Sequence, residues 1–280
     1  HRRAVMATSA AKARGSPPVS FTLRYSPTNP PLAAMACASL STYYKKALPK
    51  ERQASALNVR VIPDQSLASG PCEGVLEARF GGEGIVIEGG GLEAARCIGG
   101  VSDRMNGSAI LGGSNPLMGC EIERIIQFST ESMTSEKDAM KVCGLLDQHL
   151  ADRSLMCGQG QLSLGDCVVW EAILKSAPLS TLLGTSEGKA SKKFPNLKRW
   201  FSFVNSTPQF TQARKSFQAA KARSQAIKGE SKTSDSKVKT NSTSQNGSNG
   251  SNGSNGGSYN IPLIGAEMGK VVTRFPPEPS

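Results

Sequence analysis

The chain has 280 residues and a formal net charge of +11, and its aromatic content is only 5%. This length predicts about two domains, and the scarcity of aromatic residues predicts a smaller packed core than the length suggests. No apolar run approaches the roughly 18 residues that a membrane-spanning helix needs, so we expect no membrane association.

The N-terminal segment is basic. The first 50 residues contain no Asp or Glu, and four Arg and Lys residues lie within residues 2–14. Organellar transit peptides share this composition. The chain begins with His1, and Met6 is a candidate start. We expect residues 1–18 to form a disordered leader rather than an import signal.

Residues 19–105 predict a small mixed unit, in which period-two alternation marks strands and apolar runs mark helices. The order strand, helix, strand, strand, strand, helix is that of a thioredoxin-like unit. The predicted elements are a strand at Val19–Tyr25, a helix at 31–40, strands at 57–62, 78–80 and 85–88, and a helix at 92–98.

Residues 115–222 predict an all-helical unit, because apolar residues recur there at helical spacing. Two segments have the pattern of a helix-opening capping box, namely 135–138 and 163–166. A further helix is predicted to begin near Phe194. Trp170 and Trp200 are expected in the core rather than as base-stacking platforms.

Residues 223–258 predict a linker, because hydrophobic residues nearly vanish and the run NGSNGSNGSNGG behaves as a flexible coil. Residues 189–239 contain 13 Lys and Arg but only Glu230 and Asp235, a local net charge of +11. Such a segment attracts polyanions, and tRNA is the obvious candidate. A solvated tether explains the charge equally well.

The seven cysteines are scattered without a C-x-x-C pair, which indicates reduced thiols in a reducing compartment. The only histidines are His1 and His149, so we expect no Cys/His metal site. His149 lies late in a predicted helix, where it suits a capping or surface position.

Residues 270–280 (KVVTRFPPEPS) predict a strand that runs into a proline-rich loop. Ligands of open α/β sheets bind at the carboxyl ends of such strands. The prolines fix φ and would hold Arg274 and Glu278 in place. A disordered end has the same simple pattern, so the residues alone leave both interpretations open.

The segment 259–280 (YNIPLIGAEMGKVVTRFPPEPS) resembles the opening of the class I catalytic domain in eukaryotic-type glutamyl- and glutaminyl-tRNA synthetases, in its glutamyl branch. In that family RFPPEPS leads into the ATP-binding signature, which would lie beyond Ser280. The resemblance implies that Arg274 pairs with a carboxylate of bound glutamate. It also implies that Pro276, Pro277 and Glu278 line the amino acid and adenylate, and that Ser280 marks the entry to the ATP signature.

Upstream segments, among them 30–34, 111–115, 163–170 and 197–203, resemble the glutathione-transferase-like domain appended to those synthetases. The resemblance implies an α+β, mostly helical fold made of a thioredoxin-like subdomain and a helical subdomain. A disordered linker and, at 259–280, the start of a Rossmann-type catalytic domain would follow.

A hydroxyl after the first strand activates glutathione in transferases, and Tyr25 and Ser26 occupy that place. Both are interpreted as turn residues, because a hydroxyl at the end of a strand is far more often a turn residue than a catalytic one. No Gln/Glu-Ser pair that would hold the glutathione glutamate is found either, so no catalysis is expected there. Trp200, Arg199 and the helix at 118–127 are the places where a partner surface is expected.

The leading hypothesis is a cytoplasmic glutamate–tRNA ligase that uses ATP with magnesium, binds tRNA-Glu, and docks through its N-terminal domain onto transferase-like domains of other translation proteins. The chain as given lacks the ATP signature and is expected to be inactive alone. Two alternatives are a non-catalytic scaffold of a multi-synthetase complex and a glutathione transferase or elongation-factor-like protein.

Overall fold

The computed structural model describes residues 19–70, 73–80, 83–133, 139–158, 160–184 and 193–231. All of them lie in the first of the two units into which the chain divides, residues 1–236. The predicted leader at 1–18, the capping box at 135–138 and everything after residue 231 lie outside the described residues. Those interpretations stay predictions.

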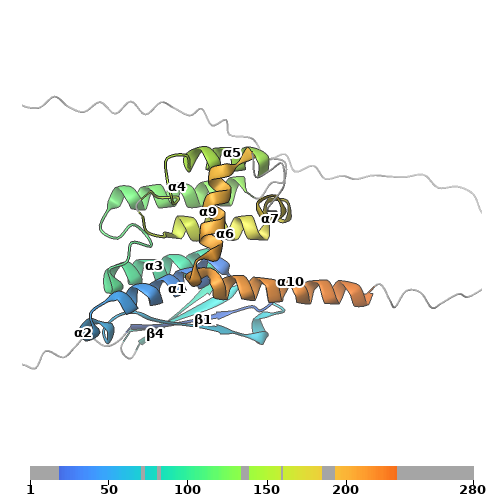
Figure 1. Ribbon diagram of the computed structural model, residues 1–280. Helices are drawn as coiled ribbons and strands as arrows, with labels where there is room; N and C mark the ends of the chain where they lie inside the picture. Colours follow the sequence, from blue (N-terminus) through green and yellow to red (C-terminus); the bar gives the residue numbers. More distant parts are fainter. Residues whose placement is uncertain are drawn as a thin grey trace, which may run out of the picture. The chain divides into compact units, whose positions relative to one another are not determined.

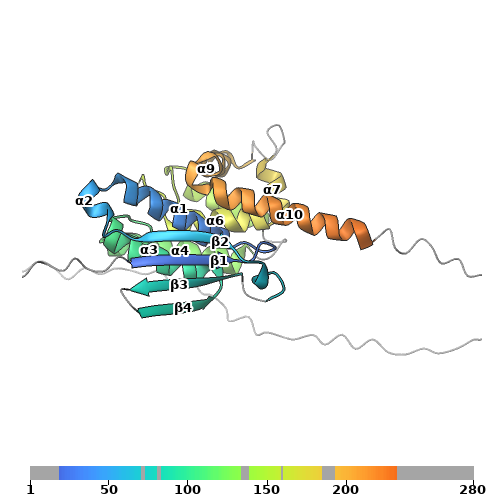
Figure 2. The ribbon, with the colours of Figure 1, turned by 90° about the horizontal axis from the view of Figure 1, so that it is seen from below.

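The first half of the described chain is a four-stranded sheet with helices on one face (Figure 1). The strand order is β2-β1-β3-β4, in which only β1 and β2 are parallel (Figure 2). This confirms the predicted thioredoxin-like order. The elements are β1 (Val19–Tyr25), α1 (Leu32–Ala47), α2 (Lys50–Gln53), β2 (Asn58–Pro63), η1 (Gln65–Leu67), β3 (Gly74–Phe80), β4 (Glu83–Gly89) and α3 (Gly91–Asn106).

The alternating sequence of β1 gives the strand one buried face, as expected. Phe21, Leu23 and Tyr25 are buried, while the residues between them are partly exposed. The Ala-rich start of α1 packs against α3, and nine residues of α1 are buried. Burial of this apolar face stabilises the sheet and its two main helices together.

Helix α3 is longer than predicted, because it continues to Asn106 instead of ending at residue 98. Glycine lowers helix propensity by about 1 kcal/mol, so the pair Gly99 and Gly100 favoured an earlier end. A Cβ at Gly99 would lie only 3.0 Å from side-chain atoms of Ile110 and Leu111. Close packing of the chain after α3 therefore leaves little room for a side chain at this position of the helix.

The second half is helical. Its helices α4 to α9 lie over α1 and α3 on the side away from the sheet, whereas α10 runs beside α1 and the sheet (Figures 1 and 2). The elements are α4 (Pro116–Ser132), α5 (Ala139–His149), α6 (Leu164–Lys175), α7 (Ala177–Gly184), α9 (Pro195–Ser206), η2 (Pro208–Phe210) and α10 (Thr211–Ser231). Helix α9 follows its N-cap Phe194, which confirms the prediction that a helix begins near this residue.

The capping box predicted at 163–166 is confirmed. The Asp166 carboxylate is fully buried and accepts hydrogen bonds from the backbone amides of Met156 (3.0 Å) and Ser163 (2.9 Å), the Ser163 hydroxyl (2.8 Å) and the Trp200 indole (2.8 Å). Burial raises the pKa of Asp166, although these hydrogen bonds favour its charged form. The cap therefore joins α6 to α9 as well as starting α6.

Both tryptophans belong to the core, as expected. Trp170 is fully buried and packs edge-on against Phe210, with ring centroids 4.9 Å apart. Trp200 is also fully buried, and its indole reaches Asp166. His149 is half-buried at the end of α5, where Nε2 donates to the carbonyl oxygen of Met156 at 2.7 Å.

Helix α10 corrects the predicted domain boundary. The linker was expected to begin at residue 223, but α10 continues to Ser231. Few hydrophobic residues occur there, yet Ala, Lys, Arg and Gln are all strong helix formers. The scarcity of hydrophobic residues after residue 223 therefore did not mark the end of the helix.

The six described cysteines are free. Burial raises the pKa of Cys143 to about 11 and that of Cys157 to about 12. Because the thiolate is the reactive form, both are poor nucleophiles at neutral pH. None of the helices in the described part of the chain is long and apolar enough to cross a membrane.

Candidate functional site

The residues singled out for glutamate and adenylate binding cannot be placed. Arg274, Pro276, Pro277, Glu278 and Ser280 lie outside the described residues, so their roles stay predictions. The site that the structure does describe lies instead where the sheet half meets the helical half.

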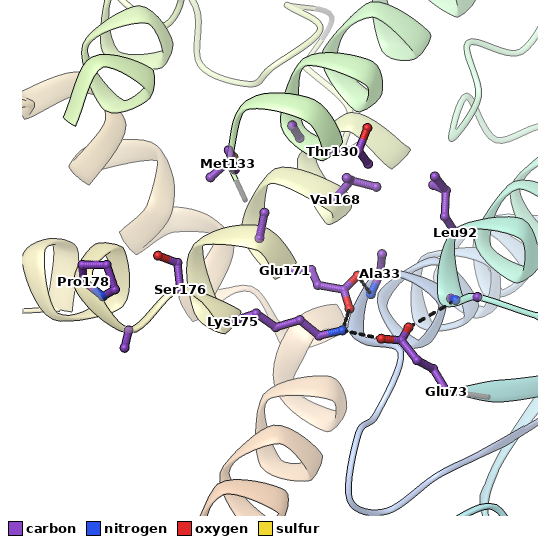
Figure 3. Close-up of a pocket in the computed structure, with 15 residues that line it drawn as sticks. Ala33, Glu73, Leu92, Thr130, Met133, Val168, Glu171, Lys175, Ser176 and Pro178 are labelled. Carbon is purple, nitrogen blue, oxygen red and sulfur yellow. Dashed lines mark hydrogen bonds and ion pairs between the residues drawn. The ribbon is translucent and has the colours of Figure 1, made fainter. Parts of the chain in front are cut away.

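A cavity of about 810 Å³ opens between the start of α3, the end of α4 and the end of α6 (Figure 3). One end is polar and the other is apolar, with Leu92, Met133 and Val168 on its wall. It is lined by Ala33, Glu73, Gly90, Gly91, Leu92, Ser129, Thr130, Met133, Val168, Glu171, Ala172, Lys175, Ser176, Ala177 and Pro178.

The polar end is a cluster of two carboxylates joined by one lysine (Figure 3). The Lys175 ammonium lies 2.8 Å from a carboxylate oxygen of Glu171 and 2.9 Å from one of Glu73. Burial disfavours the charge of Lys175, but the carboxylates of Glu171 and Glu73 outweigh it and raise its pKa. The Lys175 ammonium therefore stays charged at neutral pH.

Each carboxylate also caps a helix N-terminus. Glu171 accepts from the backbone amides of Leu32 (3.2 Å) and Ala33 (3.1 Å) at the start of α1. Glu73 accepts from the amide of Gly91 (3.3 Å) at the start of α3. Helix N-termini attract anions because their first amides lack partners and the helix dipole is positive there.

The chain therefore occupies its own anion-binding positions in this cavity. An anionic ligand that used the start of α1 or α3 would have to displace Glu171 or Glu73, together with the bonds to Lys175. Breaking such partly buried ion pairs costs free energy, because the remaining charges lose their partners. The cavity favours an apolar group over an anionic one.

The two hydroxyls considered for glutathione activation do not line this cavity. The Tyr25 hydroxyl lies 3.1 Å from that of Ser216 in α10, and the Ser26 hydroxyl lies 2.9 Å from that of Thr28. Only 7% of Tyr25 and 2% of Ser26 are exposed. Both hydroxyls have structural partners. Ser26 follows the strand, as its interpretation as a turn residue requires, but Tyr25 is the last residue of β1 and is not a turn residue.

The expected partner surface needs one correction. Trp200 is fully buried and cannot contact a partner. Arg199 is exposed, but its guanidinium donates to the carbonyl oxygens of Leu150 and Arg153 at 2.9 and 2.8 Å. The apolar spacing at α9 marked its buried face, so a residue on that face was mistaken for a surface one.

Helix α4 does present an outer face. Its core side buries Met118 and Ile122, whereas Leu117 is 80% exposed. A shallow groove runs between α3 and α4 on the outer side. It is lined by Leu92, Arg96, Cys120, Glu123, Arg124, Ile126, Gln127 and Thr130.

No family model matches the sequence. The chain is 28% identical over 168 residues to the bifunctional glutamate/proline–tRNA ligase of Mus musculus, which covers 60% of this chain and 9% of that protein. This chain thus spans about a tenth of the curated relative that it matches.

Among solved structures, glutathione transferase Omega 1C from Trametes versicolor matches with a TM-score of 0.50 at 16% identity, covering 74% of this chain and 97% of that one. The fold is glutathione-transferase-like. A chain from crystal structures of two binary sub-complexes, which concern yeast aminoacyl-tRNA synthetase complex formation, matches with a TM-score of 0.48 at 12% identity. This match covers 77% of the present chain and 99% of the yeast sub-complex chain.

Sequence reasoning missed the charge cluster of this glutathione-transferase-like domain. Glu171 and Lys175 form an i, i+4 pair on α6, which is a signal that helix reasoning can use. Glu73 has no such local signal, because it lies just before β3 and meets Lys175 only through the tertiary fold. The pattern that joins all three is not visible in the sequence.

Proposed function

We propose that this chain is the N-terminal part of a glutamate–tRNA ligase of cytoplasmic translation. The similarity over 168 residues to a glutamate/proline–tRNA ligase carries the proposal. That match is much longer than the segment 259–280, whose RFPPEPS run resembles the opening of a glutamyl-type catalytic domain. The similarity to this class of enzyme is therefore not limited to that short segment.

In this proposal the catalytic domain that begins at residue 259 binds ATP with magnesium, glutamate and tRNA-Glu. Arg274 recognises the glutamate carboxylate, because a guanidinium is permanently charged and can bind a carboxylate through two parallel hydrogen bonds. Pro276, Pro277, Glu278 and Ser280 line the adjoining loop.

The test is glutamate-dependent exchange of pyrophosphate into ATP by the full-length protein in the presence of tRNA. Arg274→Ala is expected to lower kcat/KM for glutamate about a hundredfold, because it leaves a bound carboxylate without its partner. Arg274→Lys keeps the charge but cannot form two parallel hydrogen bonds, so its kcat/KM for glutamate should lie between those of the wild type and of Arg274→Ala. Exchange that depends on another amino acid, or on none, would reject the proposal.

For the glutathione-transferase-like domain itself we propose a docking role. The polar end of its cavity is occupied by Glu73, Lys175 and Glu171, and the Tyr25 hydroxyl is bound to Ser216, so features that would support glutathione chemistry are absent from the described cavity. The exposed Leu117 and the groove between α3 and α4 offer a contact surface. The expected partner is a transferase-like domain of another translation protein.

Leu117→Asp is expected to weaken that association at least tenfold, because a charge would replace an exposed apolar contact. Calorimetric titration of the chain with the purified transferase-like domains of other synthetases and of tRNA-binding cofactors measures the effect. Tyr43→Ser, which removes an apolar side chain 54% exposed on α1, is the matched control and should bind normally. Equal losses in both variants would contradict the assignment to α4.

A further inference from the structure

The outward face of α10 combines cations with amide and hydroxyl groups. Along α10 the residues at i, i+3, i+4, i+7, i+10, i+11 and i+14 share one face. Counted from the first residue of the helix, they are Thr211, Arg214, Lys215, Gln218, Lys221, Ala222 and Gln225. Ala213 and Ala220, on the opposite side, are buried against the body of the domain.

This face is open to solvent. Residues 221–226 are all exposed, and so are Lys215 and Gln218. Figures 1 and 2 show the end of α10 extending past the sheet and the other helices. Lys215 and Lys221 form no ion pair with any residue in the described ranges.

The charge pattern differs from that of an ordinary solvated helix. Surface helices normally mix acidic and basic residues, which pair at i, i+4. Residues 211–229 contain no Asp or Glu at all. Like charges along a helix repel one another, so this arrangement costs stability unless an external anion neutralises it.

The geometry suits a polyanion with regularly spaced charges. With a rise of about 1.5 Å per residue, Lys215 and Lys221 lie about 9 Å apart along the helix axis. The exposed face carries no large hydrophobic residue, so it lacks the apolar side that a helix needs to lie in a membrane surface. The amides of Gln218, between the two lysines, and of Gln225, about one turn after Lys221, can donate to phosphate or ribose oxygens.

We propose that the outward face of α10 binds the phosphodiester backbone of folded RNA as a preformed helical arm. Naming tRNA as that RNA rests on the proposed ligase function. The arm supplies affinity without reading sequence, because it offers phosphate contacts rather than base contacts. Its helical form also fixes the lysines relative to the domain, which an unstructured basic tether would not do.

The test is fluorescence anisotropy of labelled, unfractionated tRNA with the 280-residue chain at several KCl concentrations. Lys215→Gln with Lys221→Gln should lower affinity about tenfold or more, and should reduce the slope of log affinity against log salt by about two. Lys46→Gln with Lys50→Gln removes the same charge at the exposed end of α1 and the start of α2, and should leave the slope unchanged.

The variant Ala222→Pro tests whether RNA affinity depends on the helical form of α10 or only on its positive charge. Proline breaks the helix at that position but keeps every cation, so affinity should fall while the thermal unfolding of the body is retained. Wild-type affinity in this variant would overturn the preformed arm. Equal losses in the α10 and control pairs would overturn the assignment to α10. Binding to phosphatidylserine vesicles that needs the same two lysines would indicate a membrane surface instead.

The proposal that α10 binds RNA and the proposal that the protein is a ligase can be rejected independently of each other. Glutamate-dependent pyrophosphate exchange by the full-length protein, measured at saturating tRNA, tests the ligase proposal without depending on α10. If the wild-type chain does not bind RNA but glutamate-dependent pyrophosphate exchange is normal, only the proposal that α10 binds RNA is rejected. Normal RNA binding without exchange would remove only the enzyme assignment and, with it, the naming of tRNA.

Discussion

Replacing Asp166 by alanine is expected to lower the free energy of unfolding by about 3–5 kcal/mol, because it leaves several fully buried donors without an acceptor. The amides of Met156 and Ser163 and the indole of Trp200 all lie where water cannot replace the carboxylate. For a domain of this size the midpoint of thermal unfolding should fall by about 10 °C or more.

Asp166→Asn is the informative companion variant. Its amide oxygen can still accept from Met156 and Trp200, but its amide nitrogen faces the Ser163 amide, which is also a donor. We expect an intermediate loss of stability. Asp152→Ala removes a carboxylate whose side chain is 85% exposed, and should change stability by less than about 0.5 kcal/mol. Chemical denaturation of the chain measures all three, and equal effects of the Asp166 and Asp152 variants would contradict a structural role for the buried cap.

Replacing Asp103 by alanine should have the second-largest effect, a loss of about 2–3 kcal/mol, because four hydrogen bonds disappear together. Its carboxylate accepts from the Ser108 hydroxyl (2.6 Å) and from the backbone amides of Ile110 (2.7 Å), Leu111 (2.9 Å) and Gly113 (2.9 Å). These residues form the connection between α3 and α4. The carboxylate therefore holds the sheet half against the helical half.

The expected loss is smaller than at Asp166, because Asp103 is only half-buried and water can replace some of its bonds. Asp103→Asn keeps one acceptor oxygen and should lose about half as much. Hydrogen exchange should locate the effect, with faster exchange at the amides of Ile110, Leu111 and Gly113 than in α1. Unchanged exchange at those amides in Asp103→Ala would show that the turn holds its shape without the carboxylate.

Much of the fold followed from local pattern. Alternation in β1 predicted its buried face, and the Ser163 capping box predicted the start of α6. Local pattern failed where packing opposed it. Gly99 favoured an end to α3, but the helix continues, and Ile110 and Leu111 pack closely against it where a larger residue would be crowded.

The candidate site was less predictable for a different reason. Its three charged residues come from positions 73, 171 and 175, and only the last two are neighbours in the sequence. Similarly, spacing on α9 indicated one apolar stripe with Trp200 in the core, but it did not show that Trp200 is too deeply buried to contact a partner. Periodicity identifies a face of a helix, but it does not say what covers that face.

The sequence by itself determined the order of strands and helices, the capped start of α6 and the concentration of positive charge near the C-terminal half, because each depends on residues close together in the chain. The tertiary structure alone decided that Glu73 and Glu171 occupy two helix N-termini and that α10 carries its cations on an exposed face. These features depend on contacts between distant segments, for which a single sequence contains no local signal.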